Sequence, residues 1–424
     1  MRTNGARAAR GDLGQRVRAR SGRRNVCYAV PNRPLRWACA ALSTLAILVA
    51  TLHSGGGALH QHWSLTITDG DDALAGLIQN LLLFIPFGMS FVLAGVNPLV
   101  VIALGTALSF SVEFAQQYIP GRDPSLGDII CNANSTAIGA ALVVFGGPWL
   151  WAEPRRAARQ ALATAILAVL VWLGTGMVFE PILSAPPYSA VYTPDWDYWG
   201  HYRGRVLAST FRGPPEMHLE ASVVAPNRPP GRDAPIVVMI DTTPTKVLLL
   251  GADGRTLTLL YDTRALPLTF EHPELRWRQA LDGLAPNDTF TVQSWRETSG
   301  RTSCLAVNAQ QRCGLGYTIG DGWKLIFFPE TFPIWLLMLI NMAWLGGWTI
   351  GIGWWIGRSE TSRLGYVSVA LIFAGLIVVP MVTGLKPTPV SEWLGALLGL
   401  GAGFLATRRT PRVPPLQNGE GARG

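Results

Sequence analysis

The sequence predicts a mainly α-helical, polytopic membrane helix bundle of about eight transmembrane helices, with an extracytoplasmic all-β sandwich inserted between them. Hydrophobic residues make up 49% of the 424 residues and charged residues only 15%, which is apolar for a soluble protein. Several uncharged apolar runs are long enough to cross a bilayer. Between the fifth and sixth runs lie short alternating or β-branched segments broken by Gly, Pro and Asp, a pattern typical of strands.

Charge and hydropathy divide the chain into five parts. They are, in order, a basic cytoplasmic arm (1–36), a membrane domain of five spans (37–179), an extracytoplasmic β-sandwich domain (180–330), a C-terminal membrane domain of three spans (331–407) and a cytoplasmic tail (408–424). The spans are expected near 37–52, 73–93, 98–114, a segment ending at 145, 161–178, 332–356, 364–382 and 392–406.

Arginine clusters set the predicted orientation. Basic residues that flank apolar spans stay on the cytoplasmic side of a membrane. Counting from a cytoplasmic N-terminus places the basic loop WAEPRRAARQ (151–160) and the Arg-rich tail inside, and the β-domain outside. The net charge of +8 therefore comes largely from short arms beside membrane spans, and we do not expect nucleic acid as a partner.

The β-domain carries three local signals. Asp253-Gly254 between two apolar runs predicts a tight hairpin, and repeated short strands predict a jelly-roll-like sandwich. Cys304 and Cys313 flank one short segment, which in an oxidising compartment favours a disulfide. The aromatic segment 194–202 fits a sugar-stacking platform, or else an interfacial aromatic belt or first core strand near the membrane.

Polar residues interrupt the second, third and fourth spans, where they are costly and by default mark a functional site. Glu113 and Gln116 stand at i and i+3 and share one helix face. Asp128 and Asn132 share a face of the next span, with Asp128 in its first turn. Asn80 lies roughly two turns into the second span. The predicted topology brings all five side chains to the outer third of the bilayer.

Three interpretations of this cluster remain open. A structural network, with an Arg122 ion pair to a neighbouring carboxylate, would lock the helices together. A binding pocket open to the outer leaflet would use Arg122 for a phosphate or carboxylate head group. Catalysis would use Glu113 as general base, with Asp128 or Asp123 as the partner acid or metal ligand. Glu113 and Asp128 are the catalytic candidates, and since no named catalytic, zinc or phosphate-loop motif occurs, no metal site or cofactor is predicted.

The same residues resemble the VanZ-like membrane proteins. The shared pattern is NLLLFIPFG at 80–88, then Glu-x-x-Gln, an Arg, and Asp-x-x-x-Asn followed by small residues. The matching positions are Asn80, Phe84, Pro86, Gly88, Glu113, Gln116, Arg122, Asp128, Asn132 and Gly139. Ser135 departs from the pattern, which usually has Gly there. The resemblance covers roughly residues 37–145, and since the family is named for a protein associated with teicoplanin resistance, it implies a link to glycopeptide tolerance without supplying a mechanism.

The inserted domain resembles, more weakly, concanavalin A-like or laminin-G-like modules, through HLEASVVAP and SCLAVNAQ…GLGYTIGDGW. That resemblance implies glycan as a further partner, or a scaffold role. We therefore expect an integral protein of the bacterial cytoplasmic membrane with both termini cytoplasmic. An envelope lipid or lipid-linked precursor would bind at Asn80, Glu113, Gln116, Arg122, Asp128 and Asn132. The alternative is an intramembrane enzyme that modifies a lipid-linked head group.

Overall fold

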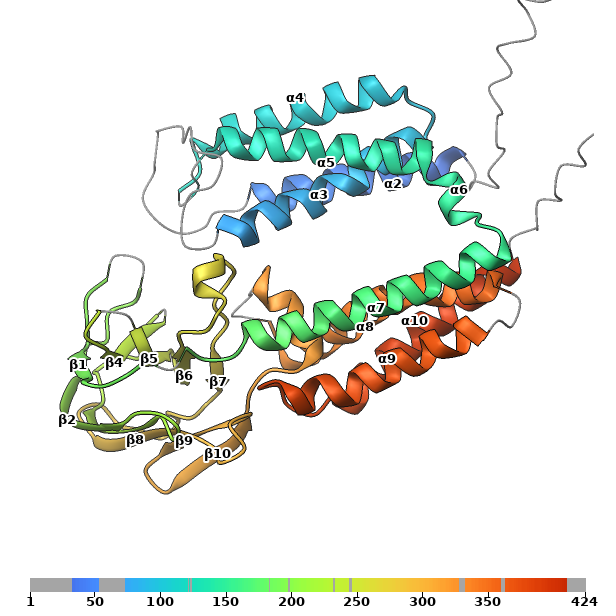
Figure 1. The fold of residues 1–424 in the computed structure, drawn as a ribbon. Helices are drawn as coiled ribbons and strands as arrows, with labels where there is room; N and C mark the ends of the chain where they lie inside the picture. Colours follow the sequence, from blue (N-terminus) through green and yellow to red (C-terminus); the bar gives the residue numbers. More distant parts are fainter. Residues whose placement is uncertain are drawn as a thin grey trace, which may run out of the picture.

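Two groups of long helices and a two-sheet domain make up the protein in a computed structural model (Figure 1). The structure describes residues 33–52, 73–120, 122, 124–182, 184–196, 199–231, 233–243, 246–327, 332–359 and 363–409. Nearly all of the predicted basic arm and most of the predicted tail lie outside these residues.

The first helix group contains α2 (Arg33–Thr51), α3 (Ala73–Leu93), α4 (Pro98–Gln116) and α5 (Leu126–Phe145). Local chemistry fixes where two of these helices start. The Asn97 side chain accepts a hydrogen bond from the Leu99 N–H at 2.9 Å, and Pro98 occupies the first turn, where its missing N–H costs nothing. Ser125 caps α5 in the same way through the Gly127 N–H at 3.1 Å.

The second helix group contains α7 (Pro154–Val178), α8 (Ile334–Arg358), α9 (Arg363–Val382) and α10 (Val390–Arg409). The short helix α6 (Gly147–Leu150) joins the two groups. Eight of the described helices are long and apolar enough to cross a membrane, which confirms the predicted number of spans. Helix α7 starts at Pro154, earlier than the expected 161, because Pro at the first turn starts a helix that runs through the basic residues before its apolar part.

Glycines let α10 pack closely on α8. A Cβ on Gly395 would lie 2.4 Å from the Met342 carbonyl oxygen, and one on Gly403 would lie 2.0 Å from that of Ile350. Gly399 lies between them on the same face and is equally close to α8. The three glycines form a small-xxx-small ladder, a pattern whose small residues let membrane helices approach at backbone distance.

The inserted domain is a sandwich of two five-stranded antiparallel sheets. One sheet has the order β1-β4-β5-β6-β7: β1 (Ser189–Tyr192), β4 (Ala234–Ile240), β5 (Lys246–Asp253), β6 (Thr256–Tyr261) and β7 (Leu275–Trp277). The other has the order β10-β9-β8-β3-β2: β2 (Arg205–Arg212), β3 (His218–Val224), β8 (Thr289–Arg296), β9 (Ser303–Val307) and β10 (Gln310–Leu315). The predicted hairpin at Asp253-Gly254 joins β5 and β6, with Gly254 at φ 57°.

The core of the sandwich draws on both sheets. Leu248 and Leu257 from one sheet and Leu219 and Val292 from the other are fully buried in one hydrophobic cluster. Alternating side chains of facing sheets that interdigitate in this way define a β-sandwich. The predicted all-β sandwich is therefore confirmed.

Two short 3-10 helices connect the sandwich to the helix groups: η1 (Leu266–Leu268) and η2 (Ile319–Leu325). Near η1, the Leu74 N–H at the start of α3 donates to the Thr269 carbonyl at 3.0 Å. Just after η2, the Ile326 carbonyl accepts from Gln79 Nε2 at 2.5 Å. The first helix group thus meets the second half of the chain at the end that carries the β-domain (Figure 1).

Candidate functional site

Close helix packing positions the polar residues of α3, α4 and α5. A Cβ on Gly88 of α3 would lie 2.2 Å from the Thr136 carbonyl oxygen of α5. In return, a Cβ on Gly139 of α5 would lie 2.2 Å from the Ile85 carbonyl oxygen. Gly105 of α4 packs against the Thr136 side chain. The three helices therefore meet at glycine contacts one to three turns from the polar cluster.

Two side-chain hydrogen bonds tie the helices together at the level of the cluster. Asn80 Nδ2 of α3 donates to Asp128 Oδ1 of α5 at 2.6 Å. Asn132 Nδ2, one turn further along α5, donates to Ser109 Oγ of α4 at 3.0 Å. The structure thus brings predicted residues from three spans into one place. Ser109 was not singled out from the sequence, since a serine in an apolar helix equally fits a packing position.

Glu113 and Gln116 close the end of the cluster that lies near the connection between α4 and α5. Glu113 is 2% exposed, and its Oε2 accepts a hydrogen bond from the Ser125 N–H at 2.8 Å. Gln116 Nε2 donates to the Thr51 carbonyl at the end of α2, at 3.0 Å. Glu113 therefore fixes the turn that leads into α5, while Gln116 attaches α2.

Arg122 lies in the connection between α4 and α5. One guanidinium nitrogen is 3.4 Å from the Ala50 carbonyl oxygen, and the side chain is half-buried. Burial lowers the pKa of Arg122, while the Glu113 carboxylate acts to raise it. Because arginine starts from a very high pKa, the group stays cationic beside the cluster. Asp123, the alternative catalytic partner, lies outside the described residues.

One acceptor in the cluster has no partner. Asn132 is 2% exposed, and its Oδ1 is a buried oxygen without a hydrogen bond in the part of the chain that the structure describes. Buried polar atoms are nearly always hydrogen-bonded, so an unpaired buried acceptor needs an explanation. Asn132 Oδ1 can therefore accept one further hydrogen bond, from a ligand or from water.

A second polar cluster lies between η2 and the second helix group. Glu392 at the start of α10 is fully buried, and its Oε2 accepts from the Gly320 N–H at 3.0 Å. Its Oε1 accepts from the Thr318 hydroxyl and, at 3.3 Å, from Asn341 Nδ2. The same two donors reach the Asp321 carboxylate, at 3.0 Å from Thr318 and 3.1 Å from Asn341.

Lys324 completes this second cluster. Its Nζ lies 2.7 Å from Asp321 Oδ1. Burial acts to raise the pKa of Asp321, but the Lys324 ammonium and the surrounding donors outweigh it and lower the pKa below the usual value. The cluster holds η2 on α8 and α10. Sequence reasoning missed it, because its members are far apart in the chain and Glu392 looks like an ordinary residue at the end of a span.

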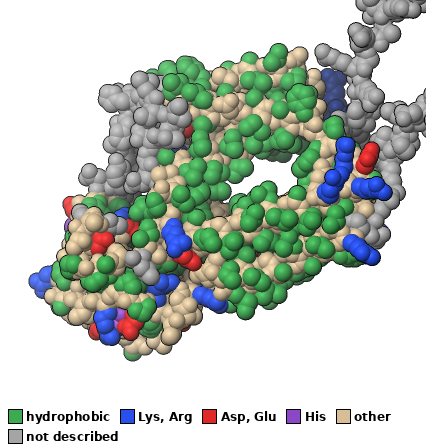
Figure 2. Space-filling model, in the orientation of Figure 1, with side chains coloured by type: hydrophobic (Ala, Val, Ile, Leu, Met, Phe, Trp, Pro, Cys, Tyr) green, Lys and Arg blue, Asp and Glu red, His purple; other side chains and the backbone are tan. Residues whose placement is uncertain are grey.

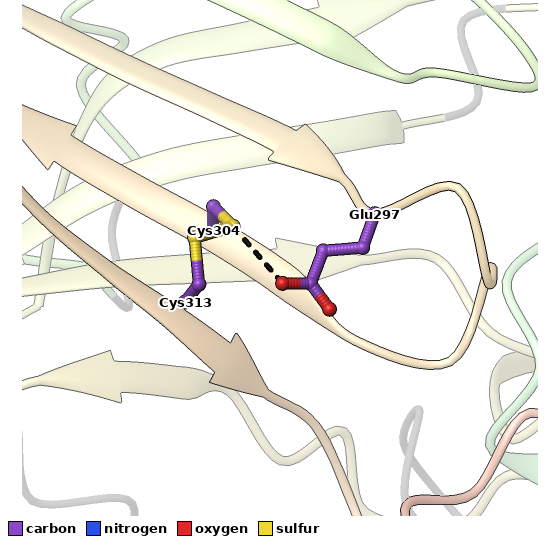
Figure 3. A group of neighbouring side chains, drawn as sticks. All are labelled: Glu297, Cys304 and Cys313. Atoms are coloured by element: carbon purple, nitrogen blue, oxygen red, sulfur yellow. Dashed lines mark hydrogen bonds between the residues drawn. A yellow bond between two sulfur atoms is a disulfide. The ribbon is translucent and has the colours of Figure 1, made fainter.

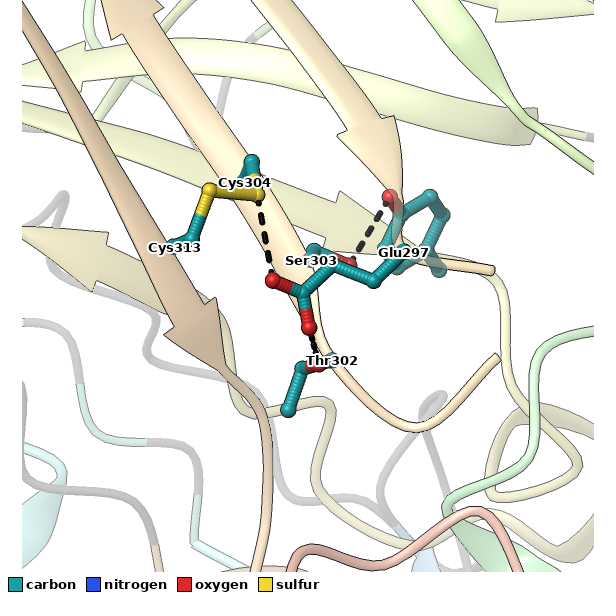
Figure 4. The surroundings of a disulfide bond; sticks show 6 residues. Glu297, Thr302, Ser303, Cys304 and Cys313 are labelled. Atoms are coloured by element: carbon teal, nitrogen blue, oxygen red, sulfur yellow. Dashed lines mark hydrogen bonds between the residues drawn. A yellow bond between two sulfur atoms is a disulfide. The ribbon is translucent and has the colours of Figure 1, made fainter. Parts of the chain in front are cut away.

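The predicted disulfide is present. Cys304 of β9 and Cys313 of β10 are bonded, and Glu297 lies beside them with Oε1 3.5 Å from Cys304 Sγ (Figure 3). The other Glu297 oxygen accepts from the Thr302 hydroxyl (Figure 4). The three groups are close enough to surround a metal ion, but joined sulfur atoms are not thiolates, and thiolates are what zinc binds.

Two aromatic residues of the segment 194–202, Trp196 and Trp199, cover one sheet of the sandwich. Trp196 and Trp199 are half-buried and pack on a cluster formed by Val238, Leu249 and Leu260. Lys246 Nζ lies 5.9 Å from the centre of the Trp196 ring and 6.0 Å from that of Trp199. The two rings thus contribute to the packing of the sheet.

The fold and the buried polar side chains define a multi-pass integral membrane protein. Residues 35–147, which contain the first helix group and its polar cluster, match the family model described as VanZ/LLP1. This part of the chain is therefore similar to VanZ-type membrane proteins. The match does not extend to the β-sandwich, so its likeness to concanavalin A-like domains stays a prediction. Comparisons with curated proteins and with solved structures found no match.

Proposed function

We propose that the protein binds the anionic head group of an envelope lipid or lipid-linked precursor at the outer end of α3, α4 and α5. It would do so in the bacterial cytoplasmic membrane, with both termini cytoplasmic and the β-sandwich outside. The similarity to VanZ-type proteins supports a role in tolerance of glycopeptide antibiotics, which act on envelope precursors. Glycan is the partner expected at the sandwich.

The observation that carries this proposal is the convergence of Asn80, Asp128, Asn132 and Glu113 from three helices, with the Arg122 guanidinium beside them. The unpaired Asn132 Oδ1 can accept a hydrogen bond from a hydroxyl or amide of the head group, while the anionic oxygens pair with Arg122. Arg122 supplies the positive charge at the edge of the cluster. Guanidinium groups suit phosphate and carboxylate because they donate two parallel hydrogen bonds.

The test is a binding titration of the purified full chain with a short-chain polyprenyl phosphate in detergent micelles. Arg122→Gln should weaken binding about tenfold, because a hydrogen bond to a charged group contributes roughly 1.5–3 kcal/mol. Asn134→Ala is the matched control: Asn134 is exposed on α5, and its side chain donates a hydrogen bond to the Ile130 carbonyl of its own helix. Equal binding by wild type and Arg122→Gln would contradict the proposal.

The pair of carboxylates Glu113 and Asp128 on facing helices favours the enzymatic alternative. Glu113→Gln and Asp128→Asn keep the side-chain shapes and remove the charges. If either variant binds the polyprenyl phosphate as wild type does but loses the glycopeptide-tolerance phenotype, the site performs chemistry. If both lose binding in parallel with tolerance, head-group recognition accounts for the function.

A further inference from the structure

An opening separates the two helix groups. Figure 2 shows it passing between α3 and α5 on one side and α7 on the other, bordered by hydrophobic side chains. Both groups are built of helices long and apolar enough to span a membrane. The opening therefore lies at the depth of the hydrocarbon core.

Protein contacts close this opening at both ends. At the end near α6, Trp354 Nε1 of α8 donates to the Leu150 carbonyl at 2.9 Å, and the Trp149 and Trp355 rings pack edge to face with centres 4.4 Å apart. At the end near the β-domain, Gln79 of α3 bonds to Ile326. The opening is thus encircled by one chain, unlike the outer surface of the helices.

The lining of the opening follows from helical spacing. Gln79 points toward the second half of the chain, and Leu82 and Pro86 stand at i+3 and i+7 on the same face of α3. Both are exposed, Leu82 to 52%. Pro86 has no N–H, so the Leu82 carbonyl on this face lacks its helical partner. On α7, Ile166 and Leu170 are exposed on the side opposite the alanines that pack on α8 and α9.

We infer that this opening holds the acyl chains of a membrane lipid, enclosed between the two helix groups. Water is excluded, because an apolar lining at hydrocarbon depth offers it too few polar partners. Acyl chains fill an irregular apolar space and enter from the bilayer itself. The inference deepens the proposed function on which it rests: α3 and α5, which border the opening, are two of the three helices that carry the polar cluster.

The experiment measures lipid retention. The full chain is reconstituted in vesicles of phosphatidylethanolamine and phosphatidylglycerol and extracted in mild detergent. Native mass spectrometry then measures the mass of the protein with any bound phospholipid. We expect retained phospholipid on the wild type. In Leu82→Trp/Leu170→Trp two indole rings occupy the opening, and retention should fall about tenfold, since displacing two buried methylene groups changes a binding constant by roughly that factor.

The matched control is Leu104→Trp. Leu104 is 44% exposed on α4, which lies on the side of the first helix group away from the second (Figure 1). This control should retain phospholipid as wild type does. Size-exclusion profiles show whether each variant folds. If the double variant misfolds, Leu82→Ala replaces it: this change enlarges the opening without filling it and should leave phospholipid retention as in the wild type. A wild type without retained lipid, a dimer in place of a lipid adduct, or equal loss in Leu104→Trp would each overturn the inference.

Arg122→Gln separates this inference from the proposed function. Loss of retention in Leu82→Trp/Leu170→Trp, with Arg122→Gln retaining lipid, supports the enclosed chains and counts against the head-group site. Loss only in Arg122→Gln supports the head-group site and overturns the enclosed chains. Loss in both supports a single lipid that uses the two places together.

Discussion

Asp262 in the β-sandwich is a buried carboxylate with an unsatisfied oxygen. It is 3% exposed, and its Oδ2 has no hydrogen bond among the described residues. Burial raises the pKa of Asp262 to about 6, against the effect of Lys246 and with a further contribution from Asp241. In the folded protein this group therefore holds its proton at pH values where it has lost it in the unfolded chain.

The sign of the pH dependence follows. Between about pH 4 and pH 6 the folded state binds more protons than the unfolded state, so the free energy of unfolding falls as the pH rises through this window. The total loss is at most about 3 kcal/mol for a shift of this size. Asp262→Asn should make this slope shallower, which thermal unfolding of the full chain at a series of pH values measures.

Asp195→Asn is the control for this prediction. The Asp195 side chain is 84% exposed, so its neutralisation should leave the pH slope as in the wild type. A slope as steep in Asp262→Asn as in the wild type would assign the pH dependence to another group.

At the scale of the elements, the contact between α3 and α5 decides whether the polar cluster forms. Gly139→Ala places a methyl group where the Ile85 carbonyl oxygen now lies. The helices must separate, and overpacking of this kind costs about 1–3 kcal/mol. We expect lower thermal stability of the detergent-solubilised chain and weaker binding of the polyprenyl phosphate, because Asn80 and Asp128 move apart.

Gly76→Ala is the matched control on the same helix pair. A Cβ on Gly76 of α3 meets nothing within 4 Å, so the same chemical change should cause no loss of stability. Helix propensity favours Ala there by up to about 1 kcal/mol. Similar losses in both variants would show that the approach of α3 to α5 is not limited by Gly139.

Sequence periodicity located one polar cluster and missed the other for a physical reason. Asn80, Glu113 and Asp128 stand out because apolar residues surround them in spans whose direction the charge pattern fixes. The partners of Glu392 come from η2 and α8, and no periodicity links a span to a turn that precedes it by many residues. Side-chain pairing across that separation is a property of the folded chain alone.

The Asn132–Ser109 contact shows the same limit within one domain. Helical spacing predicts which face of α5 carries Asn132, but the facing atom on α4 depends on how far the helices slide along each other. That register is set by Gly88, Gly105 and Gly139, whose backbone contacts are seen only in the structure.

At the scale of the whole molecule, the predicted orientation places the β-sandwich and both polar clusters on one side of the membrane. A cysteine at Pro286, which is exposed on the sandwich, tests this directly. In a background where all cysteines outside the disulfide are serine, Pro286→Cys should react in whole cells with a membrane-impermeant maleimide. Gly419→Cys in the tail should react only after the cells are permeabilised. The reverse pattern would move the polar cluster to the cytoplasmic leaflet.

The hydrogen bond between Glu392 and η2 also bears on the order in which contacts form during synthesis. Glu392 is synthesised 71 residues after Asp321 (392 − 321). At about 5–20 residues per second, α10 follows η2 by roughly 4–14 s. Helix α8 follows η2 directly, and its Asn341 bonds Asp321, so this contact can form first. Only the Glu392 contacts wait until α10 has been synthesised.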